Sequence, residues 1–116
     1  MAATLLGAQM DIYVGTRTRD GRSKGIYKMS FDSASGALGE GKLVAETEDP
    51  SFVVLHPTRK LLYSVNALTD GKLSAFAIEA DGRLLLLNQV SSKGAGPAHV
   101  QLDRSGKWLS AANYTS

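Results

Sequence analysis

The 116-residue chain contains no cysteine and only two histidines, His56 and His99. The absence of cysteine excludes disulfide bonds and thiolate metal sites. Two histidines argue against a His-based structural metal site, so no such site is expected. The sequence also lacks any apolar run near the roughly 18 residues that a membrane-spanning helix needs. No membrane association is therefore expected.

A concentration of positive charge is missing as well. The chain carries 13 Lys and Arg against 11 Asp and Glu, a formal net charge of +2, and these side chains are scattered along it. A nucleic-acid-binding protein would show a basic cluster on one face, so no nucleic acid partner is expected. Residues 1–10 lack the basic start of a signal peptide. We expect them to be a frayed leader and the protein to be cytoplasmic.

What the sequence does contain is a repeat. The segment Pro50–Pro57, followed by Lys60–Asn66, is echoed by Pro97–Arg104, followed by Lys107–Asn113. The spacing between the two copies is 47 residues. Self-similarity with a period of roughly 20–50 residues indicates an architecture built from stacked units.

The unit is predicted to be a small antiparallel sheet. Short apolar runs alternate with turns rich in Gly and Asp-Gly, which is typical of strands. Four strands fit into each repeat of about 47 residues. Nine strands are expected in all, at residues 12–16, 25–32, 43–46, 51–56, 61–66, 72–79, 84–90, 98–103 and 108–113.

Several of these strands are apolar on both faces, among them Phe52–Leu55 and Leu73–Ile78. A sheet buried on both faces needs a neighbour on each side, and the four-stranded blades of a β-propeller supply such neighbours. Helical HEAT repeats have a similar period, but frequent Gly and Pro would break their helices. The WD40 and kelch signatures are missing. The predicted fold class is therefore an all-β propeller.

The strand count divides the chain into unequal parts. We expect a first blade without its inner strand (11–49), a complete second blade (50–96) and the first half of a third (97–116). These make about two and a quarter blades, whereas propellers close with typically 4–8. We therefore expect an incomplete propeller whose bare apolar blade faces favour self-association, and no activity from this piece alone.

Several motifs resemble the opening of a known family. Ordered matches to the lactonase family of seven-bladed propellers occur at Tyr13–Thr16, Pro50–Pro57, Leu62–Asn66, Gly94–Val100 and Ala112–Tyr114. This family includes propeller-type 6-phosphogluconolactonases and fungal 3-carboxymuconate cyclases. The resemblance covers residues 11–116. It implies seven blades and the hydrolysis of a sugar lactone, such as 6-phosphogluconolactone, to its acid, without a metal or an organic cofactor.

Candidate site residues gather at one predicted rim of the blades. Lactone hydrolysis needs a base to deprotonate water and donors to stabilise the oxyanion. His99 is the only imidazole on this rim and suits a general base. Asn66, Asn113 and Tyr114 can donate hydrogen bonds to the substrate, and Arg17 and Arg19 can reach its phosphate.

Each candidate also has a structural alternative. His99 can equally pin a loop, and the recurrence of Asn66 and Asn113 favours turn capping in every blade. Tyr114 can pack against neighbours, and Arg17 and Arg19 can simply be solvated. Because a fold does not fix a function, two further hypotheses stay open. The chain can belong to a non-catalytic ligand-binding or interaction propeller, or be an inert structural fragment.

Overall fold

The computed structural model describes residues 9–116, which form nine strands and no helix. They build three antiparallel sheets, in the orders β1-β2-β3, β4-β5-β6-β7 and β8-β9. The all-β class predicted from the sequence is confirmed. The described residues hold no helix that could span a membrane. The strands are β1 (Gln9–Val14), β2 (Gly25–Asp32), β3 (Lys42–Glu46), β4 (Val53–Leu55), β5 (Leu61–Asn66), β6 (Lys72–Ile78), β7 (Leu84–Ser91), β8 (Pro97–Leu102) and β9 (Leu109–Asn113).

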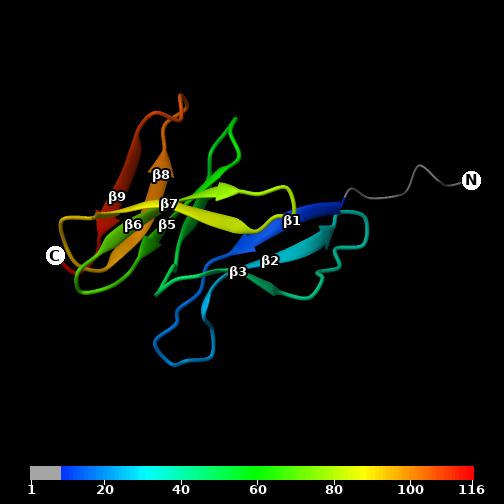
Figure 1. Ribbon diagram of the computed structural model, residues 1–116, viewed down its shortest axis with the longest axis horizontal. Coiled ribbons are helices and arrows are strands. Elements are labelled where there is room, and N and C mark those ends of the chain that lie inside the picture. Colours follow the sequence, from blue (N-terminus) through cyan, green and yellow to red (C-terminus); the bar gives the residue numbers. More distant parts are fainter. Residues whose placement is uncertain (1–8) are drawn as a thin grey trace, which may run out of the picture.

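The three sheets follow one another through the molecule in chain order, from the blue first sheet to the red third (Figure 1). β3 of the first sheet contacts β7 of the second, and β8 of the third contacts β4 and β5. Every sheet is built from strands that are neighbours in sequence, because short turns favour antiparallel pairing. This succession of sheets is the arrangement of propeller blades.

The first strand begins within the expected leader. Gln9 and Met10 pair with Asp32 and Phe31, so β1 starts two residues before the predicted boundary at residue 11. The reason is the length of β2, which is 8 residues and offers ladder partners to both. The remainder of the predicted leader, residues 1–8, lies outside the described residues.

The core lies between the first two sheets. Its buried side chains come from both sheets and form one cluster, comprising Ile26, Val44, Leu62, Phe76 and Leu84. Tyr13 packs against this cluster, and its hydroxyl donates a 2.8 Å hydrogen bond to the Gly82 carbonyl across the interface. The apolar run Leu73–Ile78 is buried or half-buried on both faces, as predicted. In the run Phe52–Leu55, however, Phe52 and Leu55 remain 37% and 51% exposed, so the prediction of burial on both faces is wrong there. On β7, likewise, Leu85 to Leu87 remain about half exposed, at 53–54%.

The repeat is visible in the backbone at one rim. Asp49 and Gly96, 47 residues apart, both adopt left-handed conformations, with φ values of 44° and 62°. The Asp49 carbonyl accepts a 3.0 Å hydrogen bond from the amide of Ala67, and the Gly96 carbonyl accepts one of 2.9 Å from Tyr114. In each blade, this bond ties the segment entering the first strand to the loop leaving the second.

At the opposite rim, the turn after β4 contacts the turn after β8. The His56 Nε2 atom lies 3.2 Å from the Gly106 carbonyl oxygen, and His56 Nδ1 accepts hydrogen bonds from the backbone amides of Thr58 and Arg59 at 3.2 and 3.1 Å. Since both amides are donors, Nδ1 must be an acceptor and Nε2 carries the proton. His56 therefore links two consecutive hairpins.

This contact predicts unequal effects of alanine at two similar glycines. Gly106 and Gly36 have φ values of 73° and 77°, so alanine is strained at both. A Cβ atom at Gly106 would collide with the His56 imidazole, whereas nothing lies within 4 Å of one at Gly36. We expect Gly106→Ala to lower the free energy of unfolding by about 1–3 kcal/mol more than Gly36→Ala. Urea denaturation checks this, and equal losses would contradict the link.

Candidate functional site

The connections β1–β2, β3–β4, β5–β6 and β7–β8 meet at the rim that carries Asp49 and Gly96. The Gly96 amide donates to the Leu68 carbonyl at 2.9 Å, and the Gly71 amide donates to the Gly94 carbonyl at 2.9 Å. These bonds hold the loop after β5 against the segment that enters β8. Three cavities open among the connected loops. Two of them contain residues predicted to bind substrate, Arg17 and Tyr114 in one and Asn66 in the other.

The first, here named the Arg17 cavity, has a volume of about 370 Å³. All three sheets contribute to it through their rim loops, and its wall includes Arg17, Arg19, Asp49, Ala67, Ala98 and Tyr114. The structure thus brings together Arg17 and Tyr114, which are 97 positions apart in sequence and were predicted as substrate-binding residues. The Tyr114 side chain is 87% exposed, so its hydroxyl is accessible from solvent.

A carboxylate beneath this cavity joins the first two sheets. Asp49 is only 2% exposed. Its Oδ1 accepts hydrogen bonds from the Thr18 amide at 2.7 Å and the Thr18 hydroxyl at 3.3 Å, and its Oδ2 accepts one from Arg19 Nε at 2.6 Å. Arg19 Nη2 also donates to the Ala67 carbonyl at 2.6 Å. We name Thr18, Arg19 and Asp49 the Asp49 clasp.

The clasp sets the charge at the cavity. Burial raises the pKa of Asp49, but the hydrogen bonds from Thr18 and the charge of Arg19 outweigh it, so the net pKa is lowered. Asp49 is therefore ionised at neutral pH, and Arg19 neutralises it. Arg17, by contrast, makes no ion pair within residues 9–116. Its guanidinium is a cation available to a bound anion.

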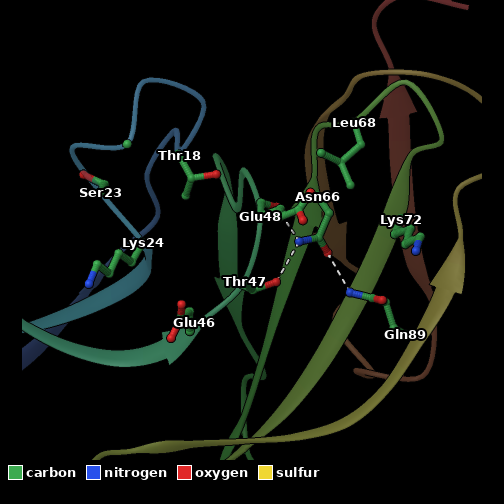
Figure 2. Close-up of a pocket in the computed structure, with 11 residues that line it drawn as sticks. Thr18, Ser23, Lys24, Glu46, Thr47, Glu48, Asn66, Leu68, Lys72 and Gln89 are labelled. Carbon is green, nitrogen blue, oxygen red and sulfur yellow. Dashed lines mark hydrogen bonds between the residues drawn. The ribbon is translucent and has the colours of Figure 1, made fainter.

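The second cavity, the Asn66 cavity, is larger, at about 620 Å³, and lies between the first and second sheets (Figure 2). Asn66 is 1% exposed. Its Nδ2 donates to the Thr47 hydroxyl at 2.9 Å and the Glu48 carbonyl at 2.6 Å. Its Oδ1 accepts a 2.7 Å hydrogen bond from the Ser74 hydroxyl and a 3.4 Å contact from Gln89. The amide is thus fully engaged within the protein.

Asn113, the repeat equivalent of Asn66, is placed similarly. Its Nδ2 donates a 2.9 Å hydrogen bond to the Ser92 carbonyl, which again ties a second strand to the segment preceding a first strand. Its Oδ1 is buried and has no hydrogen-bond partner among residues 9–116. Asn113 belongs to the wall of neither named cavity.

His99 lies on the exposed side of β8. Its ring contacts Phe52 at the entrance of the second sheet, with centroids 4.6 Å apart and planes inclined by 59°. The preceding residues Pro97 and Ala98 form part of the Arg17 cavity, but His99 does not. The predicted base is therefore adjacent in sequence to the cavity and directed towards an aromatic ring outside its wall.

Asp49 was not among the residues predicted from the sequence to be functional. One feature of the sequence does distinguish it. Asp49 precedes Pro50 at the position where the next repeat has Gly96 before Pro97, so an aspartate replaces the glycine that a left-handed conformation favours. Its bonds to Thr18 and Arg19, 31 and 30 residues away, could not be deduced from that pattern.

Comparisons with known proteins agree with this architecture. Residues 11–116 match the family model described as "Lactonase, 7-bladed beta-propeller". A 6-phosphogluconolactonase of Formosa agariphila is 38% identical over 111 residues, covering 90% of this chain and 31% of the relative. A 6-phosphogluconolactonase of Bacillus subtilis is 37% identical over 106 residues, covering 90% and 30%.

Solved structures show the same likeness. The structure of a periplasmic gluconolactonase from Pseudomonas aeruginosa superimposes with a TM-score of 0.84 at 30% sequence identity, over 92% of this chain and 31% of that chain. The chain thus spans 30–31% of the length of these relatives. The fold, the motifs and the match over residues 11–116 agree, and the chain belongs to the lactonase family of seven-bladed β-propellers.

Proposed function

We propose that the polypeptide containing this chain hydrolyses a sugar lactone, 6-phosphogluconolactone, and that this chain supplies the loops that bind the phosphate. The observation that carries the proposal is the unpaired Arg17 in the wall of a cavity that all three sheets form. An arginine guanidinium binds phosphate oxygens through two parallel hydrogen bonds. Two relatives that share 37–38% identity with the chain are 6-phosphogluconolactonases, which favours a phosphorylated substrate.

The reaction assigns a role to the neighbouring His99. In this proposal its imidazole takes a proton from water as the water oxygen bonds to the lactone carbonyl carbon. The tetrahedral intermediate then collapses with cleavage of the ring C–O bond, and the ring oxygen receives the proton. The Tyr114 hydroxyl, at the open side of the Arg17 cavity, is proposed to donate a hydrogen bond to the sugar. No cofactor is part of the proposal.

The two asparagines predicted to bind substrate receive a different proposed role. Asn66 uses its amide hydrogens and oxygen within the protein, and Asn113 uses its Nδ2 in the same way. A substrate would have to displace these bonds. We therefore favour the capping alternative, in which both side chains hold the rim loops in place.

Removing the charge of Arg17 tests the proposed phosphate site. In the full-length polypeptide, Arg17→Ala is expected to raise KM for 6-phosphogluconolactone by roughly 10- to 100-fold, the worth of a charged hydrogen bond. Lys24→Ala is the matched control, because it removes the same charge from the same loop but at the Asn66 cavity. Initial rates of acid release, corrected for spontaneous hydrolysis, measure both.

Two results would count against the proposal. Hydrolysis no faster than the spontaneous rate would contradict the lactonase function. Equal KM changes in Arg17→Ala and Lys24→Ala would contradict the assignment of the phosphate to the Arg17 cavity, because only one of these cations lies in its wall.

A binding propeller without catalysis is the second candidate function. The observation that favours it is the position of His99, which contacts Phe52 outside the cavity wall. Such a protein would bind a phosphorylated sugar through Arg17 and leave it unchanged. Calorimetric binding of 6-phosphogluconate combined with hydrolysis at the spontaneous rate would support this candidate over the enzyme.

Location and assembly stay predictions. The cytoplasmic location is proposed from the sequence, although a structurally similar gluconolactonase is periplasmic, so the fold suits either compartment. Self-association through the exposed face of β7 is proposed from its half-exposed leucines, Leu85 to Leu87. A nucleic acid partner is no part of the proposal.

A further inference from the structure

Asp49 has two features that would each lower the stability of the fold if nothing compensated for them. Its φ of 44° is in the left-handed region, which disfavours residues other than glycine, and its carboxylate is buried. Gly96 occupies the equivalent position of the next repeat with φ 62°, so the backbone shape itself does not require an aspartate. A strained residue of this kind persists where its surroundings fix it, and such residues gather at functional sites.

The hydrogen bonds of Asp49 show what the side chain adds. Its carboxylate accepts two hydrogen bonds from Thr18. Its backbone amide donates a third, of 3.0 Å, to the Thr18 hydroxyl. The Arg19 guanidinium is held by two hydrogen bonds, from Nε to Asp49 and from Nη2 to the Ala67 carbonyl. Arg17 precedes these two anchored residues directly. The clasp therefore fixes the backbone from which the free guanidinium of the Arg17 cavity extends.

We propose that Asp49 is a positioning residue for anion recognition, which makes the site selective for lactones that carry a phosphate over neutral ones. This inference rests on the proposed function. Asp49 acts through Arg17 and does not itself contact the substrate. By fixing Thr18 and Arg19, it reduces the conformational freedom that Arg17 would otherwise lose on binding, so more of the binding energy is retained.

Charge balance supports the same role. A buried carboxylate in the wall of the cavity would by itself repel an anionic substrate. Arg19 cancels that charge at a distance of 2.6 Å, so the pair presents little net charge to the cavity. Arg17 then provides the positive charge that distinguishes phosphorylated from neutral sugar lactones.

Asp49→Gly in the full-length polypeptide tests the inference, because it installs the residue of the next repeat and relieves the left-handed strain. We expect KM for 6-phosphogluconolactone to rise by about tenfold, while kcat for this lactone and KM for gluconolactone change less than about threefold. Lys93→Gly is the matched control. Lys93 is the other non-glycine residue with positive φ within residues 9–116, at 61°, and it lies outside the Arg17 cavity.

A double variant separates positioning from general damage. If Asp49 acts through Arg17, Asp49→Gly adds less than about twofold to the KM of Arg17→Ala, because the two changes remove one shared interaction. Fully multiplicative effects would overturn the inference. So would an equal loss for both lactones, or a phosphate selectivity that Asp49→Gly leaves intact.

A readout without catalysis distinguishes failure of this inference from failure of the proposed function. Calorimetry compares the binding of 6-phosphogluconate with that of gluconate, in the parent and in Asp49→Gly. A parent protein that binds the phosphorylated acid without turning over lactone refutes the enzyme, but the positioning role stands if Asp49→Gly weakens that binding by about tenfold. Unchanged binding of 6-phosphogluconate overturns the role.

Discussion

In the full-length polypeptide, replacing His99 with glutamine is expected to lower kcat for the proposed hydrolysis of 6-phosphogluconolactone by about 10²- to 10⁴-fold, the usual contribution of a general base. Glutamine is close in size and retains hydrogen bonding, but it cannot accept the proton of the attacking water. The contact with the Phe52 ring, at 4.6 Å between centroids, should survive in part. A fall in kcat with little change in KM is therefore expected from steady-state kinetics.

His56 provides the control for this exchange. It is the other histidine of the chain and lies at the opposite rim, where it links to Gly106. His56→Gln should alter stability but leave kcat within about threefold of the parent. A kcat for His99→Gln that matches the His56→Gln value would show that His99 is structural, and the binding propeller would then be the better account.

The largest expected effect on stability is that of Asn66→Ala. The truncation removes the acceptor of the buried Ser74 hydroxyl, which keeps only the hydrogen bond that it accepts from Gln89, and it removes donors to the part-buried Glu48 carbonyl and Thr47 hydroxyl. Each unsatisfied buried group costs about 1–3 kcal/mol. We expect the free energy of unfolding to fall by about 3–5 kcal/mol, measured by urea denaturation of the full-length polypeptide.

Asn113→Ala is the matched comparison within the repeat. Asn113 donates one hydrogen bond to Ser92, and its Oδ1 has no partner among residues 9–116, so its truncation should cost about 1–2 kcal/mol. We therefore predict that Asn66→Ala lowers the free energy of unfolding more than Asn113→Ala does. Equal stabilities, together with a raised KM in Asn66→Ala alone, would contradict the capping role and favour the substrate-binding role predicted from the sequence.

Much of the fold could be predicted from the sequence because the repeat fixes the register. β2 (Gly25–Asp32) and β5 (Leu61–Asn66) have the predicted bounds. Turns that contain glycine flank β2, and a turn that contains Pro57 precedes β5. β4 is shorter than the predicted 51–56 and covers only Val53–Leu55. The cause is local. The Ser51 amide donates a 2.8 Å hydrogen bond to the Asp49 carbonyl, and because of this tight turn the pairing of β4 with β5 begins only at Val53.

The candidate site could be predicted only as far as topology determines it. Connections on one rim converge in any propeller blade, which is why Arg17 and Tyr114 were expected to lie at one rim. That they line the same cavity is a finding of the structure. The clasp of Asp49 depends on a single left-handed residue and on contacts across two sheets. The left-handed conformation recurs at Gly96 in the next repeat, but the aspartate side chain and its contacts do not. The hydrogen bonds between Asn66 and the side chains of Thr47 and Ser74 could not be predicted from the sequence either.

The most direct test of a phosphate site at Arg17 is the ratio of kcat/KM for 6-phosphogluconolactone to that for gluconolactone, measured on the full-length polypeptide. The unpaired guanidinium beside a neutralised Asp49–Arg19 pair predicts a ratio on the order of 100, the value of one well-placed charged contact. A ratio near one would contradict the account.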